Sequence, residues 1–238
     1  IRIFRNSKNY GVGYVRNKII KAARGVFLAF FDDDDESVRN RLELQYKRII
    51  DYENNFSESS LIICHSSRKV NYPNGSIRNE LTLGTRVNNQ CPTGIKVAKR
   101  ILLGEPLKDG YGACPTCSQM ARLSTYQSIG GFDPNFRRSE DTDLNIRLAL
   151  NGAHFVGIRQ PLVLQNMTKT SDKNLDIEFK YAAQLLMKHR NFINKYSSYN
   201  FCQSWLKIKY LFYKRKFVGF LISSILLIVQ YPLNSLNR

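Results

Sequence analysis

Acidic residues are missing from the last quarter of this 238-residue chain. The segment from Phe179 to Arg238 contains ten Lys and Arg residues but no Asp or Glu. It therefore supplies ten units of the chain's formal net charge of +17. A segment with charge of one sign favours an anionic partner, either a membrane leaflet or a nucleic acid.

Cysteine and histidine are also scarce, which limits the kinds of site that the chain can form. Five cysteines without a secreted framework indicate a reducing compartment. Cys114 and Cys117 form a CxxC motif, but no second pair or CxxH lies nearby to complete a zinc site. No thioredoxin-like pattern surrounds the motif, so we interpret it as two ordinary thiols in a loop. His65 and His154 lie in apolar strands and are expected to be structural.

No hydrophobic run is long enough to cross a membrane. The longest, from Phe217 to Val229, has thirteen residues, whereas a spanning helix needs about 20. It follows a basic stretch, and each basic residue near an anionic leaflet adds about 1 kcal/mol of attraction. We therefore expect a helix that lies on the inner face of the cell membrane. The alternative is a C-terminal helix packed on the protein with a solvated basic face. The basic residues are Lys207, Lys209, Lys214, Arg215 and Lys216.

The first residues of the chain have the pattern of a strand that has already begun. No signal peptide is visible, and the cysteine usage predicts a cytoplasmic protein. Ile1 to Phe4 has the pattern of a strand already in progress. We therefore expect that the opening strands lie outside this sequence.

Alternating strand and helix patterns predict a doubly wound α/β domain over residues 1–165, followed by a basic helical tail over 166–238. Asn74-Gly75 predicts a hairpin turn, Gly25 a helix C-cap, and Ser37 and Ser124 helix N-caps. Two helices have apolar stripes that we expect to be buried: Val15, Ile19 and Ala22 or Ala23 in the first, and Val38, Leu42, Tyr46 and Ile49 in the second. We expect strands near 61–65, 118–123 and 153–158, and helices near 14–23, 37–52, 95–103 and 140–150.

The most informative segment is an apolar strand that ends in four aspartates. Val26 to Phe31 predicts a strand buried on both faces, and Asp32 to Asp35 follows it directly. Unpaired carboxylates are very costly to bury, so they belong at the carboxyl edge of the sheet, where α/β folds bind ligands. Such a cluster suits a hard divalent cation shared with a phosphorylated substrate. The alternative is a solvated first turn favoured by a helix dipole.

A second acidic motif follows a glycine-rich loop. Gly130 to Asp133 leads to Glu140 and Asp141 at the start of a predicted helix. These carboxylates could simply cap that helix. Alternatively, one of them is a general base that faces the aspartate cluster across one pocket, and such a base contributes roughly 10²–10⁴-fold to a rate.

With these motifs in this order, the chain resembles the inverting nucleotide-sugar glycosyltransferases of family 2, which have the GT-A fold. The matching blocks are Asn9-x-Gly11 with Arg16-Asn17 and Ala22 to Gly25, then the strand with Asp32 to Asp34, and then Gly130 to Asp133 with Glu140-Asp141 and Arg147-Leu148. The resemblance implies a mixed sheet flanked by helices and lacking its first strands. It covers residues 1 to about 160.

The resemblance also implies a role for each matching residue. Asp32, Asp33 and Arg16 correspond to residues that contact the donor nucleotide. Asp34, assisted by Asp35, corresponds to the ligand of Mn²⁺ or Mg²⁺ that bridges the donor diphosphate. Asp141 corresponds to the base that deprotonates the acceptor hydroxyl, and Glu140 to a residue that supports it.

These roles imply a metal-dependent inverting glycosyltransferase whose donor is a nucleotide-diphosphate sugar and whose acceptor is a glycan or a lipid-linked molecule, as in polysaccharide biosynthesis. The chain departs from the family in two further ways: it has no QxxRW block, which argues against a processive synthase, and Gln165-Asn166 stand where some members have a histidine. Because the opening strands are absent, an inactive remnant is one alternative. A nucleic-acid-binding protein ranks last, since the basic residues adjoin an apolar run rather than aromatic platforms for bases, and we expect no nucleic-acid partner.

Overall fold

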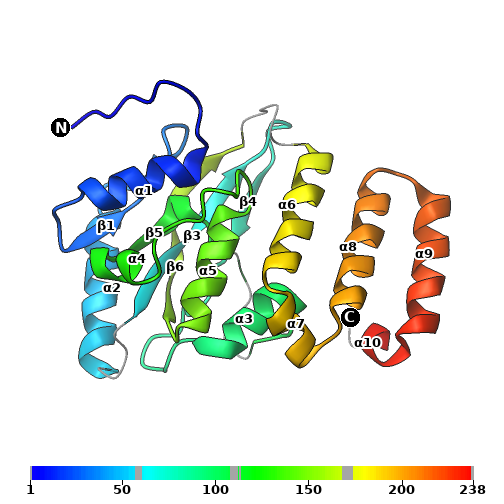
Figure 1. The fold of residues 1–238 in the computed structure, drawn as a ribbon. Helices are drawn as coiled ribbons and strands as arrows, with labels where there is room; N and C mark the ends of the chain where they lie inside the picture. Colours follow the sequence, from blue (N-terminus) through cyan, green and yellow to red (C-terminus); the bar gives the residue numbers. More distant parts are fainter. Residues whose placement is uncertain (1, 57–60, 108–111, 113, 168–173, 237–238) are drawn as a thin grey trace. The chain divides into compact units, whose positions relative to one another are not determined.

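The computed structural model describes residues 2–56, 61–107, 112, 114–167 and 174–236. The chain divides into two compact units, which we treat separately. Unit 1 contains Ile1–Ala98 and Pro106–Thr168, and unit 2 contains Lys99–Glu105 and Lys169–Arg238. Figure 1 shows the sheet among the helices of unit 1, and the series of helices that makes up most of unit 2.

Unit 1 is built on a mixed sheet with the strand order β1-β5-β3-β6-β2, in which β4 pairs with β3 as a hairpin. β3 and β6 run parallel from the Ile62–His154 pair to the Asn71–Asn166 pair, and the other neighbours are antiparallel. This arrangement confirms the predicted mixed α/β architecture. The strands are β1 (Phe27–Ala29), β2 (Glu36–Ser37), β3 (Ile62–Asn71), β4 (Ile77–Glu80), β5 (Gln119–Arg122) and β6 (His154–Asn166).

Helices cover the sheet. Successive side chains of a strand point to opposite faces, which decides which residues pack against which helix. Ile62 and Cys64 of β3 pack against Ile49 and Tyr52 of α2. Ile63, which lies between them, points to the opposite face and is fully buried. Figure 1 shows α5 crossing the front of the sheet. The helices of unit 1 are α1 (Val12–Ala22), α2 (Arg41–Asn55), α4 (Leu123–Ser128), α5 (Glu140–Leu150), the short 3₁₀ helix η1 (Thr116–Ser118) and the start of α3 (Gly94–Leu103).

Apart from the opening strand, the predicted strands lie where they were expected but differ in length. β3 and β6 both extend well beyond the predicted ends, because each supplies the other with a partner over ten paired positions. The Asn74-Gly75 turn is confirmed, with Gly75 at φ 79° between β3 and β4.

The prediction of an opening strand was wrong. Residues 2–4 have no regular structure, and Ile3 and Phe4 are 81% and 51% exposed. The next strand, β1, was predicted to be buried on both faces but is a short edge strand that pairs with β5. Val26 and Phe31 at its ends are exposed. The three residues of β1 itself are half-buried.

The predicted helix ends and buried faces also need correction. α1 ends in an extended Ala23 rather than at Gly25, and Asn40 rather than Ser37 precedes α2. Arg122 rather than Ser124 precedes α4. Ile49 is buried as predicted, whereas Val15, Ile19, Val38, Leu42 and Tyr46 are exposed. The two helices also bury polar side chains that find hydrogen-bond partners inside unit 1, namely Arg16 in α1 and Arg41 and Gln45 in α2.

Unit 2 is helical. Asn174 and Ser198 cap α6 and α8 with their side chains, and Asp176 accepts hydrogen bonds from Tyr210 and Lys214, which joins these two helices. Within the described residues, no helix combines the length and apolar character that crossing a membrane requires. The helices are the end of α3, α6 (Leu175–Lys188), α7 (Arg190–Tyr196), α8 (Tyr199–Tyr213), α9 (Phe217–Gln230) and α10 (Pro232–Leu236).

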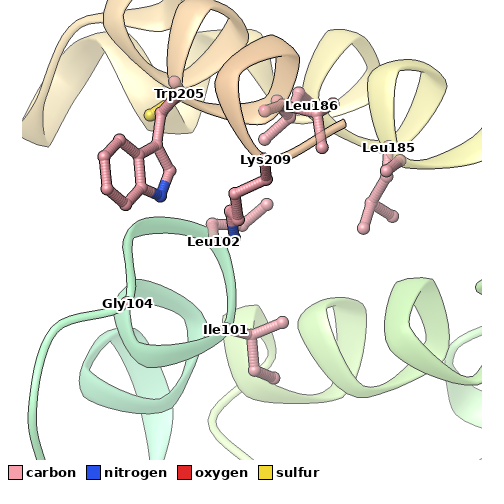
Figure 2. A pocket seen from close by; sticks show the side chains of 10 residues that line it. Ile101, Leu102, Gly104, Leu185, Leu186, Trp205 and Lys209 are labelled. Carbon is pink, nitrogen blue, oxygen red and sulfur yellow. The ribbon is translucent and has the colours of Figure 1, made fainter. Parts of the chain in front are cut away.

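Unit 2 also contains a cavity of about 210 Å³. Figure 2 shows Trp205 and Lys209 extending from α8 toward the turn at Gly104, with Leu185 and Leu186 of α6 beside them. The lining is mostly apolar, and Lys209 is the charged residue within it. All of the lining residues belong to unit 2, whereas both acidic motifs belong to unit 1.

Candidate active site

Arg16 joins the two acidic motifs. Its Nη2 atom donates to Oδ1 of Asp32 at 3.0 Å, and its Nη1 atom donates to Oε1 of Glu140 at 2.8 Å. The guanidinium is buried and lies over the rings of Phe30 and Phe132. Arg16 and Glu140 are 124 positions apart in the sequence. The expectation that the motifs come together is thus confirmed for Asp32 and Glu140.

Asn17, the neighbour of Arg16, holds the glycine-rich loop. Its amide donates to the carbonyl of Phe132 at 2.7 Å and accepts from the Phe132 N–H at 2.8 Å. Gly131 has φ 69°, and a Cβ atom there would lie 2.4 Å from the Asn17 amide oxygen. The loop can therefore pass this close only with glycine at that position. Adjacent residues of α1 bind the acidic groups and the loop that leads to α5.

The start of α5 is fixed from the other side by Arg147. Its guanidinium donates to the carbonyls of Ile129 and Gly131 and pairs with the buried Asp143 at 2.8 Å. These bonds tie the helix to the loop before it. As a result, Glu140 and Asp141 occupy the first turn of a firmly held helix.

Glu140 and Asp141 differ in their surroundings. Glu140 is buried, and this burial together with the Asp141 carboxylate raises its pKa, while Arg16 opposes the shift. Asp141 is half-buried, and its Oδ1 atom accepts from the N–H and hydroxyl groups of Thr142. Of the two carboxylates, Asp141 is the more accessible to another molecule.

The aspartate cluster forms a turn between β1 and β2. Asp33 and Asp34 are exposed, whereas Asp32 and Asp35 are half-buried. Asn166, at the end of β6, donates from its N–H to Oδ1 of Asp35 at 3.1 Å and from its amide to the carbonyl of Asp34 at 3.0 Å. Burial raises the pKa of Asp35, and the charges of Asp32 and Asp34 add to the effect. Asn166 therefore holds the acidic turn to the end of β6.

Within the described residues, Asp32, Asp35 and Cys117 form a group that could hold a metal ion. One ligand atom of each residue lies within 4.8 Å of the others. Oδ2 of Asp35 is buried and has no hydrogen-bond partner, as expected of an atom available to a cation. Two carboxylates fit Mg²⁺ or Mn²⁺, which prefer oxygen ligands. Asp34 was predicted as a ligand, but the group pairs Asp35 with Asp32.

The cysteines of the CxxC motif are free thiols. Burial raises the pKa of both Cys114 and Cys117 to about 12, so neither is a thiolate at neutral pH. A neutral thiol is a poor ligand for a hard cation. Sequence reasoning missed that Cys117 lies beside the aspartates, because the long segment before it carries no pattern that predicts where the chain returns. His65 and His154 are buried in β3 and β6, as expected for structural residues.

Comparisons with known proteins identify a similar sequence family and a similar fold. The family model of glycosyl transferase family 2 matches residues 1–99, which include Arg16 and the aspartate cluster. The structure is similar to a crystal structure of S. aureus TarS 1-349 in complex with UDP-GlcNAc, with 13% identity, a TM-score of 0.52 and coverage of 88% of this chain and 56% of that one. A crystal structure of TarS 1-349 alone gives 15% identity, a TM-score of 0.50 and coverage of 89% and 55%.

The chain therefore spans a little over half the length of the TarS structures that it matches. At these identities the similarity to the TarS structures shows a shared fold. The match to the family model shows a similarity in sequence. The search of curated proteins returned no match. Residues 1–99 of this chain are thus similar in sequence to glycosyl transferase family 2, and the chain shares its fold with the TarS structures.

Proposed function

We propose that this chain is part of a metal-dependent inverting glycosyltransferase, which transfers a sugar from a nucleotide-diphosphate donor to a hydroxyl group of a glycan or a lipid-linked acceptor. The observation that carries the proposal is that Arg16 forms ion pairs with both Asp32 and Glu140. It supports a single site in which a donor-binding turn and an acceptor-side carboxylate pair lie close together. The TarS structure with UDP-GlcNAc supports a nucleotide-sugar donor for this fold.

In the proposed reaction, Asp141 is the general base. Its carboxylate takes the proton of the acceptor hydroxyl while the hydroxyl oxygen bonds to the anomeric carbon. The bond from that carbon to the donor phosphate breaks on the opposite side, and its electron pair leaves with the nucleoside diphosphate. A single displacement of this kind inverts the anomeric configuration. Glu140, held by Arg16, fixes the helix turn that carries Asp141.

On the donor side, we propose that Asp32, Asp33 and Arg16 contact the nucleotide. Asp32 and Asp35 would hold the divalent cation, in place of the expected pair of Asp34 and Asp35. When bound, the cation stabilises the negative charge of the leaving diphosphate. The buried, unpartnered oxygen of Asp35 supports this assignment.

Calorimetry with UDP as the probe tests the donor side. We expect micromolar binding in the presence of MnCl₂, and a loss of at least tenfold in affinity with EDTA or in Asp35→Asn. Asp176→Asn, which changes an exposed carboxylate of unit 2, is the matched control and should bind as the wild type does. No UDP binding by the wild type in MnCl₂ would instead support the inactive remnant.

We also propose that unit 2 binds an anionic membrane surface at the inner face of the cell membrane. α9 exposes apolar side chains that a lipid surface would cover, and Lys214, Arg215 and Lys216 directly precede it. The exposed residues of α9 are Phe217, Val218, Leu221, Ile222, Ile225, Leu226, Ile228 and Val229.

Sedimentation with vesicles at physiological salt tests the membrane proposal. The chain should sediment with vesicles that contain phosphatidylserine and less with purely phosphatidylcholine vesicles. Leu221→Glu with Ile225→Glu should abolish this binding, because each change places a charge on the apolar surface. Binding to duplex DNA that exceeds binding to the anionic vesicles would overturn the proposal in favour of a nucleic-acid partner.

A further inference from the structure

Arg41, in the first turn of α2, is a buried cation beside the acidic turn. It is 1% exposed. Its Nη2 atom donates to the carbonyl of Phe30 at 2.9 Å, and its Nη1 atom donates to the Ser37 hydroxyl at 3.0 Å. Burying a charge is costly unless the surroundings compensate for it. Here backbone and side-chain oxygens do so, together with the ring of Phe31 at 4.3 Å from the guanidinium carbon.

The hydrogen-bond partners of Arg41 flank the candidate metal group. Phe30 lies two residues before Asp32, and Ser37 lies two residues after Asp35. The third partner is the carbonyl of Gln119 at 3.5 Å, two residues after Cys117. One guanidinium therefore reaches both ends of the acidic turn and the segment that follows Cys117.

Gln45, one turn further along α2, completes this arrangement. It accepts a hydrogen bond from Nε of Arg41 at 3.0 Å and donates to the carbonyl of Ser118 at 2.8 Å. Gln45 is itself fully buried. Ser118 is the neighbour of Cys117, so the Arg41–Gln45 pair holds the η1 segment at two consecutive carbonyls.

We infer that Arg41, supported by Gln45, is a positioning residue that sets the spacing of Asp32, Asp35 and Cys117, and through that spacing the affinity for a divalent cation. This inference rests on the proposed function, because it assumes that the group binds a metal. Outer residues that orient metal ligands typically change metal affinity by about 10–100-fold when they are replaced. Lysine cannot replace Arg41, since a single ammonium group cannot reproduce the fork of donors that reaches separate segments.

The test compares Arg41→Lys with Arg48→Lys. Arg48 lies on the same helix and also donates to backbone carbonyls, those of Gly157 and Arg86, but it does not contact the acidic turn. Electron paramagnetic resonance of Mn²⁺ in the presence of UDP measures the dissociation constant of the cation. We expect Arg41→Lys to raise it by about 10–100-fold, and Arg48→Lys to leave it within about twofold of the wild type.

A second measurement needs no metal. Arg48 donates to the sulfur of Cys91 at 3.5 Å, whereas the Arg41–Gln45 pair binds the carbonyls that follow Cys117. Labelling with a thiol reagent, resolved by peptide mass spectrometry, should be faster at Cys117 in Arg41→Lys and faster at Cys91 in Arg48→Lys. Gln45→Met, which removes the bond to Ser118 but keeps the guanidinium, should speed Cys117 labelling by a smaller factor. It serves as the second variant if Arg41→Lys does not fold.

The outcomes separate the two proposals. Unchanged Mn²⁺ affinity and unchanged Cys117 labelling in Arg41→Lys would overturn the positioning role. If the wild type binds no Mn²⁺, the proposed metal function fails, and the Cys117 labelling rates alone decide whether Arg41 holds the segments together. Equal effects of Arg41→Lys and Arg48→Lys on Mn²⁺ affinity would also overturn the inference, because they would show a general loss of stability.

Discussion

Replacing Asp141 with Asn is expected to lower the turnover number by about 10²–10⁴-fold, the range that a positioned general base contributes. The amide keeps the size and the hydrogen bonds of the carboxylate but cannot accept the acceptor's proton. Because the change leaves the donor side untouched, the KM for the donor should remain close to that of the wild type. Steady-state kinetics of sugar transfer by the intact protein measure both quantities.

Two further variants make this experiment decisive. Asp51→Asn changes an exposed carboxylate on α2 and should leave turnover unchanged. Glu140→Gln breaks the ion pair with Arg16 and tests the neighbouring carboxylate. Full turnover in Asp141→Asn together with a large loss in Glu140→Gln would move the role of base to Glu140, whose pKa is already raised by its burial.

Replacing Arg16 with Met is expected to lower the free energy of unfolding by about 3 kcal/mol, within the range for breaking a buried ion pair. Met fills a similar volume but leaves Glu140, which is buried, without its cation. Asp32 contributes less to the loss because its side chain remains 32% exposed. Urea denaturation followed by circular dichroism measures the change.

The loss should depend on pH in a defined direction. The pKa of Glu140 is raised in the folded protein. Below the pKa of an unfolded glutamate the carboxyl group is protonated in both states, so its ionisation costs no stability. As the pH rises through the folded pKa, the buried carboxylate becomes charged and the fold is destabilised. Without Arg16 this cost grows, so the difference between Arg16→Met and the wild type should be smaller at pH 4 than at pH 7. Arg16→Lys, which keeps the charge, should be less destabilised than Arg16→Met at pH 7. Equal stability of Arg16→Met and the wild type at pH 7 would show that the ion pairs contribute nothing.

Most strands and helices of unit 1 could be read from the sequence, except the opening strand and β2, but the buried faces of two helices could be read only in part. Hydrophobic periodicity placed Val15 and Leu42 inside, whereas the structure buries Arg16 and Arg41. Periodicity fails here because these arginines find carboxylates and carbonyls far away in the sequence. An analysis of the hydrophobic pattern within one helix cannot detect such partners.

The acidic residues of the site were predictable because they stand in short motifs at the ends of elements. Cys117 was not recognised as their neighbour, and Asn166 was noted only as standing where some members of the resembling family have a histidine. Cys117 reaches the site through a long irregular segment, and Asn166 does so because β6 runs beyond its predicted end and β2 pairs with it. Long-range strand pairing, rather than local pattern, decides both placements.

The shared guanidinium of Arg16 has a thermodynamic consequence. In the proposed site, a cation that draws Asp32 away would leave more of Arg16 to Glu140, so occupancy of the acidic turn would change the electrostatics at Glu140. Linkage is reciprocal, and an acceptor that engages Glu140 would therefore alter the affinity for the cation by the same factor. A cation and an acceptor that never touch the same side chain would still affect each other through one arginine.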